Sequence, residues 1–346
     1  MFMRLSMSVR IRAAVAGANG YAGMTLVQML DRHPQVELVQ LTSRTYAGKP
    51  YSDVFPLLDL EGTFTELETL DAAEVDVVFS CLTHNVCAAH AGAWLRAGAR
   101  VVDMAADFRL KDPEEYPRWY KQIHPAPDLL GKAVFGLPEL HAEELKSAQL
   151  IAVPGCYSTA SILALAPAVA SGLAGPDLIV DAKSGVSGAG RSPGMGTHFA
   201  EVDESVHAYA ITGHRHLAEL RQELGFLSSG AKPTITFVPH LIPMIRGILA
   251  TCYFDLQGSV EDLVAAYRSF YADQPFTRLI SSPPRTKLTS HSNLCLINVS
   301  EQGSKAVVTA ALDNLVKGAS GQGIECFNIA FGLDRRSGLE GVLQWP

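Results

Sequence analysis

The sequence predicts an α/β protein of two domains, a doubly wound domain followed by an α+β domain with a mixed or antiparallel sheet. Its 346 residues are too many for one average domain and suit two. In the first half, short apolar runs alternate with helical stretches, which is the pattern of a parallel sheet. The second half changes to β-rich runs with few helices between them, which is typical of a mixed or antiparallel sheet.

The first half begins with a predicted strand at residues 9–16 and a predicted helix at residues 21–31. Residues 112–130 are rich in proline, tyrosine and charge, and they predict a surface excursion. Hydrophobic periodicity indicates the other elements of this half. These are strands at residues 36–42, 75–81, 100–103 and 150–153, and a helix at residues 86–97.

The second half opens with an apolar helical stretch at residues 160–170 and ends with a predicted helix at residues 321–331. Between them lie β-rich runs and two further helical patterns. The predicted strands are residues 178–183, 234–239, 248–256, 294–299 and 305–312, and the helices are residues 217–224 and 260–271.

Composition excludes several classes of protein. The net charge of −7 offers no basic surface for nucleic acid. Six scattered cysteines without a C-x-x-C pair favour reduced thiols over a disulfide framework or a zinc site. No run reaches the ~18 apolar residues of a membrane span, and the N-terminal segment lacks the apolar core of a signal peptide. We therefore expect a cytoplasmic protein with neither membrane nor nucleic-acid partners.

A glycine-rich turn follows the first predicted strand and opens the first helix, with the spacing G-x-x-G-x-x-G. Glycines let the backbone approach a pyrophosphate, and a helix N-terminus supplies free N–H groups. A plain structural turn is the alternative, but the strand-before, helix-after context favours a dinucleotide. The predicted contacts in this turn are Gly17, Asn19, Gly20, Tyr21, Ala22 and Gly23.

The end of the second strand distinguishes the two nicotinamide cofactors. NAD enzymes tend to place a carboxylate there for the ribose 2′-hydroxyl, whereas this chain has Ser43 and Arg44. A hydroxyl and a guanidinium suit a 2′-phosphate. The sequence thus predicts NADP(H), and a solvated loop arginine is the alternative.

Cys156 follows a Pro-Gly pair at the junction of a strand and an apolar helix. A helix N-terminus stabilises a thiolate, so we expect the pKa of this thiol to be lowered. A thiolate beside a nicotinamide suggests attack on an acyl phosphate, loss of phosphate and hydride reduction of the thioester to an aldehyde. A histidine is the usual proton carrier for such a step. The other five cysteines are expected to be small buried hydrophobes.

The chain resembles the N-acetyl-gamma-glutamyl-phosphate reductases, which belong to a superfamily resembling aspartate-semialdehyde dehydrogenase. The resemblance runs in family order from Gly17 to Gly332. The blocks that carry it are Ala106-Asp107-Phe108-Arg109-Leu110, Gly136-Leu137-Pro138-Glu139-Leu140, Pro154-Gly155-Cys156-Tyr157, residues 183–191, His214-Arg215-His216, Pro239-His240-Leu241, Arg246-Gly247 and residues 313–322.

The resemblance implies an N-terminal Rossmann domain, residues 1–153 with 320–346, onto which the C-terminal helix returns. Residues 154–319 would form the catalytic and oligomerisation domain of a homo-oligomer, either a dimer or a tetramer. It implies NADPH-dependent reduction of N-acetyl-L-glutamyl 5-phosphate to the 5-semialdehyde in arginine biosynthesis. A carrier-linked aminoadipyl-phosphate reductase of lysine biosynthesis and a non-catalytic NADP-binding sensor are the alternatives.

The resemblance also implies site residues. Cys156 is the nucleophile, and the catalytic histidine is His216 or His214, with Glu219 nearby. Residues two apart point to opposite faces of an extended chain, so we expect one histidine to face the thiol. No third ligand stands at a metal-site spacing beside the two histidines, so no metal is expected.

Further contacts are expected from both halves of the chain. Arg109, Lys183 and Arg191 are candidates for the carboxylate and phosphate of the substrate, and a structural ion pair is the alternative for Arg109. Ser187 and Gly188 lie in a turn that could present backbone N–H groups to an anion. The remaining predicted cofactor contacts are Thr83 and Asn314.

Overall fold

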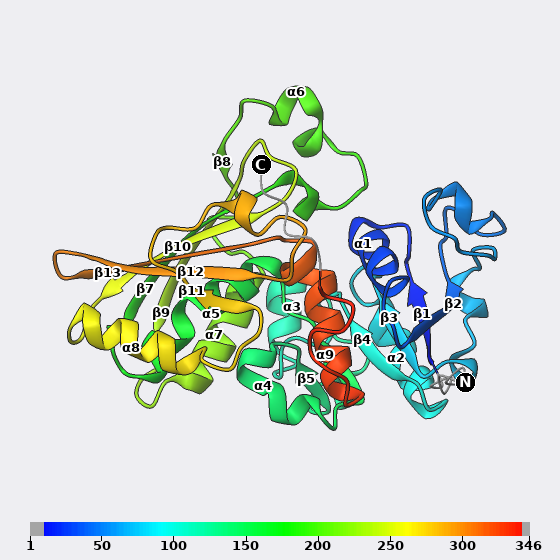
Figure 1. Ribbon diagram of the computed structural model, residues 1–346, viewed down its shortest axis with the longest axis horizontal. Coiled ribbons are helices and arrows are strands. Elements are labelled where there is room, and N and C mark those ends of the chain that lie inside the picture. Colours follow the sequence, from blue (N-terminus) through cyan, green and yellow to red (C-terminus); the bar gives the residue numbers. More distant parts are fainter. Residues whose placement is uncertain (1–9, 341–346) are drawn as a thin grey trace, which may run out of the picture.

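The computed structural model describes residues 10–340 and contains two sheets (Figure 1). The first has six parallel strands in the order β2-β1-β3-β4-β6-β5. The second has seven strands in the order β11-β12-β13-β10-β7-β9-β8, of which β7–β9 and β11–β12 pair in parallel and the rest antiparallel. The predicted fold class is confirmed.

The first sheet comprises β1 (Ile11–Ala16), β2 (Val36–Leu41), β3 (Val77–Ser80), β4 (Arg100–Asp103), β5 (Ala133–Phe135) and β6 (Leu150–Ala152). The second comprises β7 (Asp177–Ser184), β8 (His207–Ala208), β9 (Thr234–Leu241), β10 (Ile248–Asp255), β11 (Thr277–Leu279), β12 (Cys295–Gln302) and β13 (Lys305–Leu312).

Helices pack on both faces of the parallel sheet, which is why its strands are nearly continuous apolar runs. Apolar side chains of α1 (Tyr21–Leu30), α4 (Pro138–Leu145) and α9 (Gly321–Ala330) share one core with the sheet. Those of α2 (Val86–Arg96) and α3 (Glu115–Tyr120) share the core on the other face. Helix α9 comes from the end of the chain and lies between the two sheets in Figure 1.

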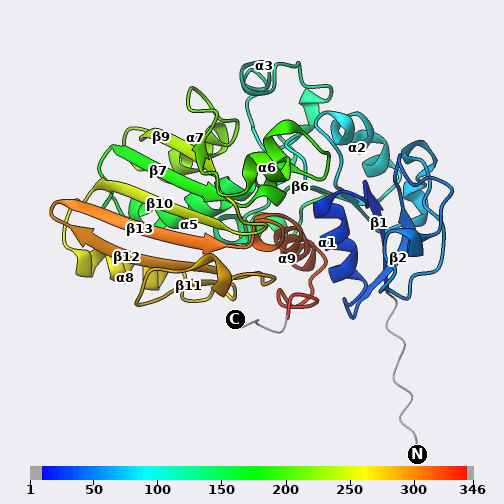
Figure 2. The same cartoon turned by 90° about the horizontal axis from the view of Figure 1, so that it is seen from above.

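The second sheet is covered on one face by α5 (Cys156–Ala170), α7 (His216–Leu227) and α8 (Val260–Phe270), as Figure 2 shows from above. Strand β7 alternates strictly between buried and more exposed residues. Its buried side chains face α5, whereas Ile179, Asp181 and Lys183 lie on the opposite face. The short helix α6 (Phe199–Val202) lies in a loop excursion beyond this sheet.

Several elements differ from those that periodicity predicts. Helix α3 forms inside the expected surface excursion, and β5 and α4 were not predicted. Strands of two or three residues, such as β8 and β11, are too short to show a period and depend on pairing with a longer neighbour. Strand β1 is described from Ile11, so the predicted start at Val9 lies outside the described residues, as do residues 1–9 and 341–346 of the predicted first domain.

A buried lysine anchors the turn that leads into α9. Residues Val316–Ser320 form a single π-helical turn, and Lys317 is completely buried in it. Its ammonium lies 2.8 Å from Glu139 of α4 and 2.9 Å from Glu325 of α9. Two carboxylates therefore compensate one buried cation and join three segments of the chain.

Within residues 10–340, no helix is long and apolar enough to cross a membrane.

Replacing Lys317 by Met should lower the free energy of unfolding by about 3–5 kcal/mol, because a buried carboxylate then loses its cation. Urea unfolding followed by tryptophan fluorescence measures the change. Lys305→Met is the matched control, because the Lys305–Asp255 pair is half-exposed and should contribute about 0–1 kcal/mol. Equal losses for the two variants would contradict this interpretation.

Candidate active site

Cys156 is the first residue of α5, joined to β6 by residues 153–155, and it is half-buried. Two glycines bring neighbouring groups against it. A Cβ on Gly155 would lie 2.3 Å from Nε2 of His216, and a Cβ on Gly318 would lie 2.8 Å from Cβ of Cys156. The absence of side chains at these two positions lets the His216 ring pack against Gly155 and the turn before α9 pack against Cys156.

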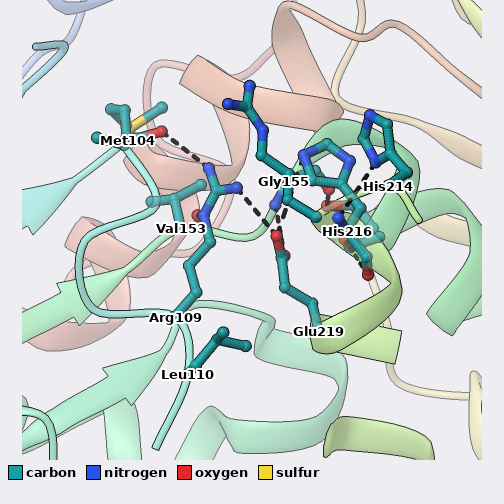
Figure 3. Close-up of polar contacts among 12 residues, drawn as sticks. Met104, Arg109, Leu110, Val153, Gly155, His214, His216 and Glu219 are labelled. Carbon is teal, nitrogen blue, oxygen red and sulfur yellow. Dashed lines mark hydrogen bonds and ion pairs between the residues drawn. The ribbon is translucent and has the colours of Figure 1, made fainter. Parts of the chain in front are cut away.

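Glu219 of α7 braces the turn that carries the thiol (Figure 3). Its carboxylate is fully buried and accepts hydrogen bonds from the backbone N–H of Gly155, at 2.8 Å, and from Arg109, at 3.1 Å. Arg109 also donates to the carbonyl oxygens of Val153, at 2.7 Å, and Met104, at 3.0 Å. The guanidinium thus binds the β6 side of the β6–α5 junction directly and the α5 side through Glu219. The structural ion pair considered for Arg109 is present.

The two histidines lie side by side, with ring centroids 4.6 Å apart. The chain here is not extended, because Arg215 between the two histidines already has helical backbone angles as the N-cap of α7. Of the two rings, that of His216 is the one that lies against Gly155. His214 accepts a hydrogen bond from the backbone N–H of His216 at 3.2 Å and packs among aromatic rings. The structure therefore brings His216 to the nucleophile turn and places His214 behind it.

Burial controls the ionisation of these groups. It lowers the pKa of His216 well below the usual value, and the neighbouring His214 and the charge of Arg109 lower it further. Burial also raises the pKa of Cys156 to about 11, against the lowering effects of Arg109 and of a backbone N–H group. The expectation of a lowered thiol pKa is thus wrong for the free protein, because desolvation outweighs the helix N-terminus.

The glycine-rich turn is shaped for close approach of a ligand. Gly17 has a φ of 81°, and a Cβ there would lie 2.7 Å from the carbonyl oxygen of Cys81. A Cβ on Gly23 would lie 2.4 Å from the carbonyl oxygen of Gly17, so strand and helix pack directly. Gly20 is the N-cap of α1, and within the described residues no side chain caps this N-terminus. The uncapped N–H groups fit an anionic pyrophosphate.

The other predicted cofactor contacts of this domain lie at the same carboxyl edge of the sheet. Ser43 is buried, and its hydroxyl donates to the Asn19 side chain at 2.9 Å. Arg44 and Thr83 are exposed, in the loops that follow β2 and β3. This edge of a doubly wound sheet is where dinucleotides bind.

The second domain meets the glycine-rich turn through the loop after β7. Arg191 donates to the carbonyl oxygen of Asn19 at 2.9 Å. Asn314 donates to Ser187 at 3.0 Å, and its side-chain oxygen accepts from Gly247 at 2.7 Å. A cavity of about 650 Å³ lies here, lined in part by Tyr21, Ser187 and Arg191. Gly188 is adjacent, since a Cβ there would lie 3.7 Å from the Asn314 amide.

The three predicted substrate-binding cations are not brought together. Arg109 is buried beside the nucleophile turn, whereas Arg191 lies at the glycine-rich turn. Lys183 is on the sheet face opposite α5, in an ion pair with Asp181 at 2.8 Å. Sequence reasoning did not single out Gly318 or Arg215, although both lie within blocks that carry the family resemblance.

Two family models match the two domains. The semialdehyde dehydrogenase NAD binding domain matches residues 12–148, and the semialdehyde dehydrogenase dimerisation domain matches residues 156–314. The chain is 46% identical, over 97% of its length and 99% of the relative, to N-acetyl-gamma-glutamyl-phosphate reductase of Dehalococcoides mccartyi. It is 47% identical, over 97% of its length and the whole relative, to the protein of that name in Ectopseudomonas mendocina.

The chain belongs to the N-acetyl-gamma-glutamyl-phosphate reductase family. This membership makes it an NADP-dependent oxidoreductase and confirms the predicted family and cofactor.

The reductase also shares its fold with two solved structures. Aspartate semialdehyde dehydrogenase II of Vibrio cholerae has a TM-score of 0.73 at 16% identity and covers 94% of this chain and 99% of its own. The Candida albicans enzyme with NADP has a TM-score of 0.65 at 18% identity and covers 93% and 98%.

Alkylation of Cys156 by iodoacetamide in the free reductase should be slow at pH 7 and should accelerate about tenfold per pH unit up to pH 10. The reason is that the reactive thiolate forms only as the pH approaches a pKa of about 11. Mass spectrometry of the Cys156 peptide at a series of pH values measures the rate, and Cys156→Ser verifies the assignment. A rate that levels off by pH 8 would show that the thiol is already ionised.

Replacing Arg44 by Ala should weaken binding of NADPH about tenfold and leave NADH binding nearly unchanged, because only NADPH carries the 2′-phosphate. Fluorescence titration with each nucleotide measures the two dissociation constants. Arg32, an exposed arginine just after α1, provides the control Arg32→Ala. Equal weakening of NADPH and NADH would remove the phosphate role of Arg44.

Proposed function

We propose that this reductase converts N-acetyl-L-glutamyl 5-phosphate and NADPH to N-acetyl-L-glutamate 5-semialdehyde, phosphate and NADP, as a step of arginine biosynthesis. The observation that carries the proposal is the contact between the neutral His216 ring and the braced turn that presents Cys156. The names of the relatives support the substrate. Neither alternative has a comparable observation in its favour.

In the first step, His216 accepts the proton of the Cys156 thiol. A neutral imidazole can do this, whereas an imidazolium cannot. The sulfur attacks the acyl carbon, a C–S bond forms, the C–O bond to phosphate breaks, and phosphate leaves with the electron pair. Because burial raises the pKa of the thiol to about 11 and lowers the pKa of His216, the transfer is unfavourable on its own, and the proton moves to His216 as the C–S bond forms.

In the second step, the thioester is reduced and the aldehyde is released. When bound, NADPH supplies the hydride that reduces the thioester carbon. The resulting thiohemiacetal oxyanion collapses, the C–S bond breaks, and the aldehyde leaves. The Cys156 thiolate takes its proton back from the His216 imidazolium, which returns both groups to their starting state. Glu219 and Arg109 hold the nucleophile turn throughout, because their hydrogen bonds are made to its backbone and its flank.

We assign binding of NADP(H) to the carboxyl edge of the first sheet. The uncapped N-terminus of α1 would hold the pyrophosphate, and Ser43 with Arg44 the 2′-phosphate. The nicotinamide end would be positioned by residues on the second domain's side of the neighbouring interdomain contact, namely Ser187, Gly188 and Asn314. Thr83 follows β3 at the same edge.

We also propose that the reductase is a cytoplasmic homo-oligomer, dimer or tetramer, paired through the open face of the second sheet. The matching model is named a dimerisation domain and spans this sheet. Ile179 is 45% exposed on this face, although it is a large apolar residue in a central strand. The six unpaired cysteines suit a reducing compartment.

The purified protein should form NADPH when given N-acetylglutamate 5-semialdehyde, phosphate and NADP, as measured at 340 nm. Replacing Cys156 by Ser should lower kcat by at least about 10³-fold while NADPH binding is retained, because no thioester forms. Turnover retained by this variant would reject the covalent mechanism. Faster turnover of a carrier-linked aminoadipyl substrate would move the proposed function to lysine biosynthesis.

The two histidines should differ in their effect on that assay. His216→Asn should lower kcat about 10²- to 10⁴-fold through loss of acid–base catalysis, whereas His214→Asn should act more weakly because His214 packs behind it. The opposite order would exchange their assigned roles.

A further inference from the structure

One hydrogen bond links an exposed arginine of the catalytic domain to the nucleotide-binding domain. Arg215, the N-cap of α7, donates to Nε2 of His84 at 2.5 Å. His84 lies in the loop between β3 and α2, and its ring packs edge-on against Tyr120 of α3, with centroids 5.3 Å apart. Arg215 is also the residue directly before His216. The guanidinium is therefore held where the two domains meet, beside the proposed acid–base group.

The charge of Arg215 has no anionic counterpart in the part of the chain that the structure describes. No carboxylate of residues 10–340 lies within ion-pair distance of it. Its one side-chain partner is a neutral ring, since burial and then the charge of Arg215 lower the pKa of His84 to about 4. The same charge lowers the pKa of His214 to about 4, after the larger effect of burial. The nearby guanidinium of Arg109 differs, because Glu219 neutralises it at 3.1 Å.

We propose that Arg215 binds the carboxylate of the amino-acid substrate and that His84 orients its guanidinium for this purpose. The inference deepens the proposed function and rests on it. One Nη donates to His84, which leaves the other guanidinium N–H groups for the ligand. A guanidinium matches a carboxylate bidentately and with fixed geometry.

The position of Arg215 favours the carboxylate over the phosphate of the substrate. Phosphate leaves from the carbon that Cys156 attacks, so it must lie next to the half-buried thiol. The carboxylate is separated from that carbon by three carbons of the substrate. Arg215 is exposed whereas His216 is buried, so it occupies the outer side of the site, where this distal group would lie.

His84 acts through Arg215 and is a positioning residue. Because it stays neutral, it accepts an N–H of Arg215 and adds no competing positive charge. Its Nδ1 is buried, and within the described chain it has no hydrogen-bond partner. The hydroxyl of Tyr120, whose ring packs on His84, is likewise buried and unpartnered in that part of the chain. Both atoms belong to residues of this one contact, and each needs a hydrogen-bond partner that the described part of the chain does not supply.

The test compares N-acetylglutamate 5-semialdehyde with its methyl ester in the reverse reaction with phosphate and NADP. The wild-type reductase should prefer the acid by about 10- to 100-fold in kcat/KM, the size expected for charge-assisted hydrogen bonds. In Arg215→Met, kcat/KM for the acid should fall to that of the ester, while KM for phosphate stays unchanged. His84→Gln, which keeps an acceptor, should retain most of the preference, whereas His84→Leu should lose it.

Arg118→Met is the matched control, because Arg118 is an exposed arginine on α3; it should keep the wild-type preference. Thermal melting and NADP titration verify that each variant is folded. If Arg215→Met keeps the acid-to-ester ratio, or raises KM for phosphate instead, the inference is wrong. Absence of turnover by the wild-type protein would instead reject the proposed function, so the two failures are distinguishable.

Discussion

The site depends on one buried carboxylate, that of Glu219. It receives the backbone N–H of Gly155 and the guanidinium of Arg109, which in turn binds the carbonyl oxygens of Val153 and Met104. These groups come from the end of β4, the loop after it, the β6–α5 junction and α7. A buried ion left without its partner is strongly destabilising, so each segment is held in place by the others. The thiol sits on the backbone that this contact fixes.

The ionisation of the free site follows from the same burial. The thiol is protonated and the imidazole of His216 is neutral, because both groups are desolvated. Both groups are therefore uncharged in the free protein, and under the proposed mechanism one proton passes from thiol to imidazole as the sulfur attacks and returns at the end of each turnover. The site needs no charged nucleophile at rest, and a reactive thiolate is not exposed to oxidants while substrate is absent.

Residues near the C-terminus pack against both Cys156 and the first domain. Lys317 anchors the turn before α9 between two carboxylates, and the next residue, Gly318, packs against Cys156. Helix α9 then enters the core of the first domain. Asn314 joins the two loops of the second domain that approach the glycine-rich turn. The C-terminal block thus packs against Cys156 through Gly318 and against the first domain through α9.

The sequence alone was sufficient to predict the two-domain class, the family, and the positions of the glycine-rich turn and of Cys156 at the starts of helices. These features depend on short-range patterns, in which a strand, a turn and a helix follow one another within about ten residues. It did not predict short elements such as β5, which need a partner strand, or the side-by-side histidines, which depend on the helical conformation of Arg215. Tertiary structure alone decided that Arg109 braces the turn, that Arg191 reaches Asn19 and that the pKa of Cys156 is raised. Each of these is set by burial or by contact between segments far apart in sequence, and local patterns carry no information about either.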